Sequence, residues 1–486
     1  MKKTIILLII LVLFSSCDLF KAYQVLSEIV PEPVLPKDYT NDVMMPINEQ
    51  FAPNIDNTWT FMIVLNGDNN LESYAIEDFN EMELGLYKAL LRNPNLVNHL
   101  NIIVLFDRGT YAWSGGVPGW DDTRIFKISP DADMGATNSE DITFNYRNNT
   151  GAQEEQNLGA PEAFTDFINY CTSTYLTDHY ALIVWNHGNG PIISKSMASF
   201  SLSISKPNYS ISGDDNDGSY NYDECTIKEL QSALATTNLL SEKKLDLMGF
   251  DACLMASVEV AYQFRDQVDY LVASMDEEGP DGWNYETLFE NMGITQGGYH
   301  DSRTLSKVMV QNYYDSYKNS KDSGEYATMS AIDLSKIEAL KPKIDNLAYS
   351  LAASSDRNAI IPIRQDSYSY KDLGIYGIGL YVDCYDFCAN IEINYGKESF
   401  LGQAARDVIE EFSHSIVAAY GHEDYGHYIG PGEFVKRGLY IVYSNELRGL
   451  ENLSFIDWYN DSKLDFCKTT SNGITDTWTE LLQDWF

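Results

Sequence analysis

Residues 245–274, LDLMGFDACLMASVEVAYQFRDQVDYLVAS, contain two apolar runs, LDLMGFD at 245–251 and DYLVAS at 269–274. Both runs are apolar at nearly every position, which is typical of strands that are buried on both faces of a sheet. Strands of this kind usually pair in parallel and are covered by helices on both faces. The stretch therefore predicts two strands of a mostly parallel sheet.

Three earlier runs have the same character, and two segments between them carry apolar residues at helical spacing. The runs are WTFMIVLN at 59–66, NIIVLFD at 101–107 and YALIVWN at 180–186, and the helical segments lie at 71–91 and 160–175. Strands that alternate with helices in this way predict an α/β fold, with helical layers on both sides of the sheet.

The pattern changes beyond about residue 340. Helices are expected at 343–355 and 397–420, and isolated strands at 377–383 and 437–444. The chain has 486 residues, which is more than a single hydrophobic core usually organises. We therefore expect a main domain over residues 58–340 and a C-terminal α+β subdomain over residues 341–486.

The first 17 residues have the features of an export signal. Lys2 and Lys3 precede an apolar run that is too short to span a membrane with normal flanks, and Ser-Ser-Cys17 follows it. The pattern resembles a bacterial lipobox, with Cys17 as the acylated first mature residue, and an ordinary cleaved signal is the alternative. Residues 18–57 contain five prolines and are expected to be a tether. These features predict a membrane-anchored lipoprotein of the bacterial cell envelope.

The chain carries 71 acidic and 33 basic residues, for a formal net charge of -38. Such a charge repels the phosphates of nucleic acids, so nucleic-acid binding is not expected. Attraction of basic substrates or calcium and a simple solvated surface remain as two interpretations. Charge alone therefore selects no function.

Six cysteines remain if Cys17 is lipidated, and they are widely spaced. This spacing is not that of a dense disulfide framework. Cys384 and Cys388 lie four residues apart, but no second Cys or His pair lies nearby to complete a zinc site. Buried thiols or one disulfide are expected.

Two of the predicted strands are followed directly by side chains that can carry chemistry. His187 follows the run at 180–186, and Cys253 lies just past the run at 245–251. In α/β folds the carboxyl ends of strands hold the functional sites. An imidazole near a thiol stabilises the thiolate and later protonates the leaving amine, and Gly188 lets a substrate backbone approach. The alternative is a core histidine and an inert buried cysteine.

Three motifs carry a resemblance to a known family: WTFMIVLNGDNNLESYAIEDFNEME at 59–83, ALIVWNHGNG at 181–190, and residues 245–274. Together, and in this order, they resemble the clostripain family of cysteine peptidases. The resemblance continues weakly through GPDGWNY at 279–285 and the end of the chain at 477–486. The sequence NHGNG departs from the commoner aspartate-histidine form of the second motif.

The resemblance implies a caspase-like α/β/α fold and an endopeptidase with a catalytic dyad of His187 and Cys253. It also implies cleavage after Arg or Lys, with Asp251 and Asp281 lining the pocket for the basic side chain. A carboxylate is the natural partner of a guanidinium or ammonium group. Alternatively, Asp251 is a hydrogen-bonded residue at a strand end and Asp281 belongs to a solvated turn. The triplet at 68–70 either positions backbone near the site or caps a helix.

The chemistry of this family requires no cofactor, although some members depend on calcium and mature by cleavage between the histidine and the cysteine. Asp215, Asp217 and Glu224 lie at the spacing of a calcium-binding loop, but Gly213 occupies the first ligand position. A calcium site and a polar turn are the two interpretations of this segment.

Two other functions remain open. The chain could be a catalytically silent surface lipoprotein that keeps this fold for binding or adhesion, or a peptidase that prefers acidic residues. The sequence does not indicate the natural substrate, the membrane or the oligomeric state.

Overall fold

The structure is a computed structural model. It describes residues 58–109, 120–146, 155–191, 211–214, 223–279, 281–294, 301–317, 327–353, 357–369, 381–421, 438–443, 459, 464–468 and 477–485. All of these residues belong to one compact unit. The expected signal at 1–17, with Cys17, and the tether at 18–57 lie outside the described residues. Among the described helices, none is long and apolar enough to cross a membrane.

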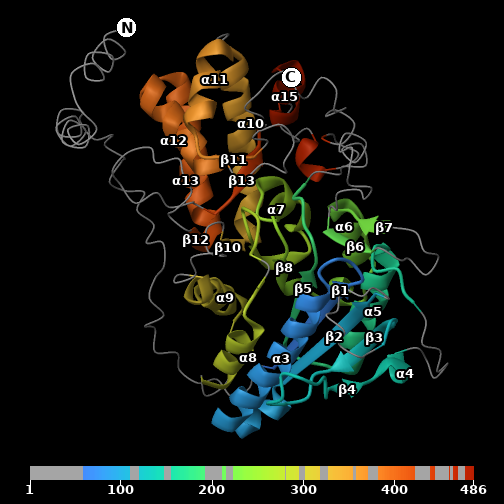
Figure 1. The fold of residues 1–486 in the computed structure, drawn as a ribbon. Coiled ribbons are helices and arrows are strands. Elements are labelled where there is room, and N and C mark those ends of the chain that lie inside the picture. Colours follow the sequence, from blue (N-terminus) through green and yellow to red (C-terminus); the bar gives the residue numbers. More distant parts are fainter. Residues whose placement is uncertain are drawn as a thin grey trace, which may run out of the picture. The chain divides into compact units, whose positions relative to one another are not determined.

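A nine-stranded sheet forms the centre of this unit, with the strand order β12-β10-β9-β8-β5-β1-β2-β3-β4 (Figure 1). Its five central strands run parallel to one another. They are β9 (Val268–Ala273), β8 (Leu245–Asp251), β5 (His179–Trp185), β1 (Trp59–Gly67) and β2 (Leu100–Arg108). These strands are the five apolar runs of the sequence, so the predicted parallel sheet is confirmed.

Antiparallel strands extend the sheet at both edges. They are β3 (Thr123–Lys127) and β4 (Glu140–Asp141) beyond β2, and β10 (Thr328–Asp333) and β12 (Ile416–Gly421) beyond β9. Two small antiparallel pairs lie outside this sheet. They are β6 (Ile211–Asp214) with β7 (Asp223–Cys225), and β11 (Tyr381–Asp383) with β13 (Tyr440–Val442).

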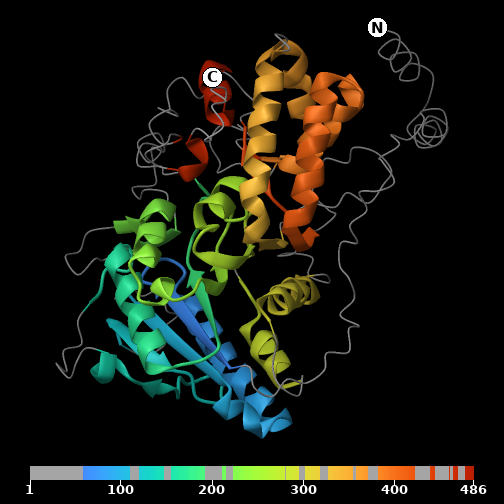
Figure 2. The same ribbon diagram turned by 180° about the vertical axis from the view of Figure 1, so that it is seen from behind.

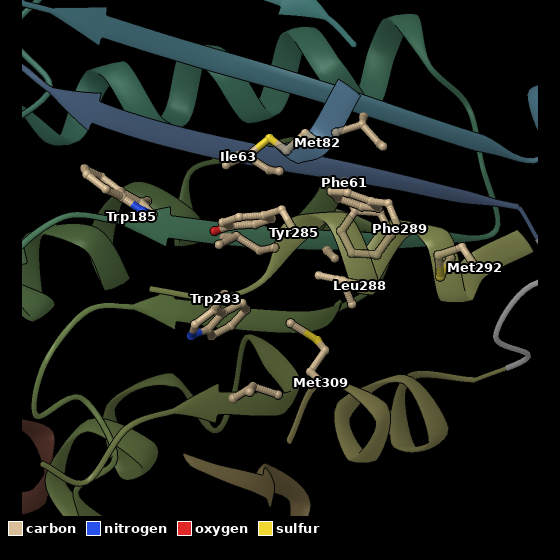
Figure 3. Packing of buried hydrophobic residues seen from close by; sticks show 14 of the residues in the cluster. Phe61, Ile63, Met82, Trp185, Trp283, Tyr285, Leu288, Phe289, Met292 and Met309 are labelled. Carbon is tan, nitrogen blue, oxygen red and sulfur yellow. The ribbon is translucent and has the colours of Figure 1, made fainter. Parts of the chain in front are cut away.

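Helices cover both faces of the sheet because successive strand residues point to opposite faces. Every residue of β1 is buried. Phe61, Ile63 and Leu65 pack in one apolar cluster with three helices (Figure 3). These are α3 (Glu72–Arg92), α8 (Tyr285–Ile294) and α9 (Ser302–Tyr317). On the other side of β1, α5 (Pro161–Thr174) contacts the strand. Helix α6 (Ile227–Ala235) packs on α5, and α7 (Val258–Phe264) packs on α6. The expected helical layers on both sides are present.

The C-terminal part of the chain contains a group of packed helices, seen in orange in Figures 1 and 2. Its helices are α10 (Ile337–Ala353), α11 (Arg357–Asp366), α12 (Cys384–Tyr395) and α13 (Phe400–Ser415), and α15 (Trp478–Trp485) packs on α10. The remaining short elements are α4 (Thr143–Tyr146) and the 3-10 turns η1 (Pro94–Asn98), η3 (Leu239–Ser241), η5 (Leu334–Lys336) and η7 (Asp465–Cys467). The division of the chain at residue 340 stays a prediction.

The helix expected at 397–420 is shorter than the sequence indicated. Helix α13 ends at Ser415, and the following residues form β12, which pairs with β10 in the central sheet. The run IVAAY is apolar and partly β-branched, so a helix and a strand fit its pattern equally well. The open edge of β10 is what selects the strand.

All six described cysteines are free thiols, and only Cys253 among them is not fully buried. Cys384 and Cys388 lie one turn apart on α12. Of the two expectations for these residues, buried thiols are what the structure contains.

The close approach of α3 to α8 generates a prediction about stability. A β-carbon at Gly85 would lie 2.6 Å from the backbone oxygen of Glu286. Because backbone on both sides must move apart, Gly85→Ala should lower the free energy of unfolding by about 1–3 kcal/mol. Urea denaturation would measure this, with Glu77→Ala on the exposed face of α3 as the control. Equal stability of the two variants would contradict the packing.

Candidate active site

The segments that carry His187 and Cys253 lie side by side because of the register between two parallel strands. Trp185 of β5 pairs with Asp251 of β8, and the N–H of Asn186 donates to the Asp251 carbonyl at 3.3 Å. His187 and Cys253 are each two residues beyond this pair. A β-carbon on Gly188 would lie 2.4 Å from the backbone oxygen of Cys253. The structure thus brings the segment His187–Gly190, the histidine loop, against the segment Cys253–Met255, the cysteine turn.

The cysteine turn has an unusual backbone. Leu254 has a φ of 64°, a conformation that side-chain-bearing residues rarely adopt. Its N–H donates to the carbonyl of Asp276 at 3.0 Å. Leu254 therefore offers no free N–H to a substrate oxygen, which leaves the backbone near Gly188 and Cys253 as the expected source of oxyanion donors.

The thiol of Cys253 lies in an acidic environment. The backbone N–H of Glu278 donates to its Sγ at 3.2 Å. Burial of the sulfur, with the negative charge of Glu278 as the next cause, raises the pKa of the Cys253 thiol to about 12. The free protein therefore holds a neutral thiol at pH 7, whereas the sequence led us to expect a thiolate.

The imidazole of His187 is held from the opposite side by Asn70. Its Nε2 lies 2.9 Å from Oδ1 of Asn70. Because an amide oxygen only accepts hydrogen bonds, Nε2 carries the proton in this contact. Nδ1 is then the nitrogen without a proton in a neutral ring, and it is the one that can act as a base.

The triplet at 68–70 thus has a different role for each residue. The side chain of Asn69 accepts from the N–H of Leu71 at 2.8 Å, which is the turn-forming contact that precedes α3. Asn70 reaches His187 instead. The helix-cap interpretation is wrong, because the N-cap of α3 is Leu71 and no side chain makes a cap hydrogen bond there.

Asp251 is buried beside the cysteine turn, with 4% of its surface exposed, and we call the surroundings of its carboxyl group the acidic pocket. Its Oδ2 accepts from the hydroxyl of Tyr285 at 2.8 Å and from the N–H of Trp283 at 3.4 Å. Burial raises the pKa of Asp251 to about 6. Among the described residues, no basic side chain forms an ion pair with it.

Glu278 is a second carboxyl group of this pocket. Burial, together with the charge of Asp251, raises the pKa of Glu278 well above its usual value. Two carboxyl groups this close share a proton at neutral pH, so the pair carries about one negative charge. The pocket therefore combines low polarity with a net negative charge.

Asp281 lies in an exposed turn next to this pocket. The following residue, Gly282, has a φ of 54°, and a β-carbon there would lie 3.2 Å from Oδ1 of Asp251. The turn thus passes directly over Asp251, and the hydroxyl of Tyr317 holds it by donating to the Gly282 carbonyl at 2.9 Å.

Glu278 and Asp78 are two residues of the site that the sequence had not indicated. Asp78, on α3, accepts from the indole N–H of Trp185 at 2.7 Å, and burial with the charge of Asp251 raises its pKa well above the usual value. The signal for Glu278 was present, since three acidic residues at 276–278 follow the end of β9 at the same edge of the sheet. For Asp78 there was none, because its position on a helix is ordinary.

One acidic cluster has the composition of a site for a hard cation. Oxygen atoms of Asp68, Asp107 and Glu155 lie within 4.8 Å of one another. Burial and the neighbouring carboxylates raise the pKa of Glu155 to about 8 and that of Asp107 well above its usual value. Protons or a cation must neutralise such a group.

The calcium loop considered from the sequence falls largely outside the described residues, which omit Asp215 and Asp217. Glu224 is described, and it is 5% exposed on β7. The carbonyl of Gly213 accepts side-chain N–H groups from Asn66 and Asn186, both at 3.1 Å. Calcium at this segment stays a prediction.

Known proteins resemble this chain over most of its length. Clostripain from Hathewaya histolytica is 28% identical over 509 aligned residues, which cover 93% of this chain and 91% of that protein. A solved structure of a secreted C11 cysteine protease from Bacteroides thetaiotaomicron, in complex with an irreversible peptide inhibitor, has a TM-score of 0.56 at 20% identity, covering 83% of this chain and 98% of that one.

A second solved structure, an inactive zymogen C11 protease from Parabacteroides distasonis, has a TM-score of 0.56 at 18% identity, covering 86% of this chain and 98% of that one. At these identities the two structures show the fold, and they confirm the expected caspase-like architecture. The sequence profile of the clostripain family matches residues 63–485. The chain therefore belongs to the clostripain family, and it is a cysteine endopeptidase.

Proposed function

We propose that this endopeptidase cleaves peptides after Arg or Lys, with Cys253 as the nucleophile and His187 as its base. The observation that supports this best is the acidic pocket of Asp251 and Glu278, which adjoins the Cys253 sulfur through the Glu278 N–H. A basic side chain that entered this pocket would bring the preceding carbonyl close to the thiol. Asp281, in the turn above Asp251, is placed to contribute at the entrance.

The neutral thiol of Cys253 determines the order of proton transfer. With a pKa of about 12, the thiol must lose its proton as it attacks the carbonyl. Nδ1 of His187 takes that proton, because Asn70 holds the opposite nitrogen in its protonated form. The imidazolium then gives a proton to the leaving amine, and water releases the acyl-enzyme. Asn70 is the positioning residue in this sequence of steps.

A basic substrate also relieves an electrostatic cost of the free protein. Asp251 and Glu278 are buried together, and the charge of each is destabilised by burial. A guanidinium or ammonium group would allow both to ionise, because opposite charges in a dehydrated slot attract strongly. An acidic side chain would add a second negative charge beside the one that the pair carries, so the rival preference for acidic residues is disfavoured.

The second candidate function is a silent lipoprotein of this fold that binds peptides without cleaving them. It draws on the same pocket, and the closeness of the histidine loop to the cysteine turn counts against it. We further propose that the chain is exported and held at the cell envelope by lipid on Cys17, as its first 17 residues predict. The same proposal includes a test of whether the peptidase activity depends on calcium bound at Asp215, Asp217 and Glu224.

Reporter peptides that end in Arg, Lys, Asp or Ala would test the function directly. The purified chain should cleave after Arg and Lys, and Cys253→Ala should lower kcat by at least about 10⁴-fold, because the nucleophile is lost. Cys467→Ala, which removes a different free thiol, should leave kcat unchanged. Assays with added calcium and with a chelator belong to the same series. Absence of cleavage under every condition would favour the binding lipoprotein.

The role of Asp251 predicts a pH dependence. Below pH 6 Asp251 takes up a proton and loses its attraction for a cation, so kcat/KM for Arg substrates should fall as the pH decreases through about 6. Asp251→Asn should lower kcat/KM for Arg by about 10²–10³-fold at pH 7. Asp281→Asn should cost less, because Asp281 is exposed. A variant at Asp251 that retains full selectivity for Arg over Ala would refute the pocket.

The contact between Asn70 and His187 predicts a loss in kcat rather than in binding. Asn70→Ala should reduce kcat by about 10–100-fold with little change in KM, because the ring is no longer held with its proton on Nε2. The basic side of the pH profile should shift as well. Ser73→Ala, an exposed position in the first turn of α3, is the matched control. An unchanged kcat would remove Asn70 from the mechanism.

A further inference from the structure

Two tyrosines from the C-terminal part of the chain contact both segments of the active site. The hydroxyl of Tyr381, on β11, donates to the carbonyl of Asn189 in the histidine loop at 2.9 Å. The hydroxyl of Tyr440, on β13, donates to the carbonyl of Leu254 in the cysteine turn. Each catalytic segment is therefore bonded to one member of the pair.

The two tyrosines also contact each other. Tyr381 and Tyr440 are 1% and 0% exposed, and their ring centroids lie 4.5 Å apart. Their strands β11 and β13 pair in antiparallel orientation. Burial raises the pKa of the Tyr440 hydroxyl well above its usual value, so it keeps its proton and remains a donor. The pair is thus a rigid bridge between the histidine loop and the cysteine turn.

The backbone around the bridge leaves little freedom. A β-carbon at Gly190 would lie 1.9 Å from the Tyr440 hydroxyl oxygen, and Gly190 has a φ of 67°. The N–H of Tyr440 donates to the carbonyl of Ala256 at 3.2 Å. The Tyr440 hydroxyl is bonded to Leu254, the residue with the strained φ of 64°. Such strain persists only where the surroundings hold it in place.

The strand that carries Tyr440 is itself tied to the core. The N–H of Val442 donates to Oε1 of Glu259 at 3.0 Å, and the hydroxyl of Tyr459 donates to the same oxygen at 2.8 Å. The indole N–H of Trp478 donates to the Val442 carbonyl at 3.0 Å. Because Glu259 belongs to α7, directly after the cysteine turn, this support cannot move independently of Cys253.

We propose that Tyr381 and Tyr440 are positioning residues, which hold His187 and Cys253 at their reacting distance through the carbonyls of Asn189 and Leu254. The inference rests on the proposed roles of His187 and Cys253. Both tyrosines are buried, so in this proposal they act through those carbonyls and not by contact with the substrate. Removing a hydroxyl leaves a buried carbonyl without its donor and frees the segment that this carbonyl belongs to. A displacement of about 1 Å between reacting groups lowers the rate by about 10²-fold.

The test compares Tyr440→Phe, Tyr381→Phe and the double variant with the wild type. Each single change should lower kcat by about 10–100-fold and leave KM within about threefold, since the basic-residue pocket is untouched. The double variant should have the same kcat as the slower single variant, because the pair acts as one unit. Its loss of kcat should at most equal about the product of the two single losses. If a single variant, which keeps one of the two tyrosines, has the kcat of the wild type, the two tyrosines do not act as one unit.

Tyr180→Phe is the matched control, because Tyr180 is a buried tyrosine at the start of β5 whose hydroxyl donates to the Tyr175 carbonyl at 3.2 Å. Thermal unfolding of all variants separates positioning from stability. If Tyr440→Phe and Tyr381→Phe keep kcat within about twofold of Tyr180→Phe, the proposal is wrong. A loss of kcat that merely follows the melting temperature across the three variants would also overturn it.

A second readout keeps the inference separate from the proposed function. The alkylation rate of Cys253 by iodoacetamide, measured with Cys253→Ala as the blank, reports the environment of the sulfur and requires no peptide cleavage. Tyr440→Phe should change this rate by at least about threefold, because the cysteine turn sets the Glu278 N–H contact to the sulfur. If the wild type cleaves no peptide, the proposed function fails, but the alkylation rate still tests the positioning role of the tyrosines. An alkylation rate that is the same in Tyr440→Phe and the wild type rejects that role.

Discussion

The parallel register between β5 and β8 is the constraint on which the site depends. Pairing Trp185 with Asp251 places the two residues that follow each strand at the same height on the same edge of the sheet. Hydrophobic burial on both faces fixes this register, because a slip by one residue would move every side chain to the opposite face. The closeness of the histidine loop to the cysteine turn thus follows from the packing of apolar residues far from either segment.

Burial of negative charge is the second property of this site. Burial raises the pKa values of Asp78, Asp251 and Glu278, and the charge of Asp251 raises those of Asp78 and Glu278 further. The same field keeps Cys253 as a neutral thiol. A positively charged substrate group would change both conditions at once, by neutralising the pocket and by lowering the cost of forming a thiolate. Under the proposed preference for Arg or Lys, specificity and reactivity are coupled through one electrostatic environment.

The C-terminal part of the chain contributes to the site without supplying its reactive groups. Strand β12 completes one edge of the central sheet, and β11 and β13 bring Tyr381 and Tyr440 against the histidine loop and the cysteine turn. Leu254 and Gly190 adopt left-handed backbone conformations at those contacts. An arrangement of this kind makes the rigidity of the site a property of the whole unit and not of the motifs alone.

Apolar patterning is a local property, so it was enough to predict the five parallel strands and the helices α3 and α5. It also placed His187, Cys253 and Asp251 at strand ends. The tertiary structure alone decided that residues 416–421 form a strand, that Asn70 reaches His187, and that Glu278 and the two tyrosines adjoin the cysteine turn. Those contacts join residues far apart in the chain, and their side chains are ordinary in their local context. Only folding creates the shared burial that raises the pKa of Cys253 and of its acidic neighbours.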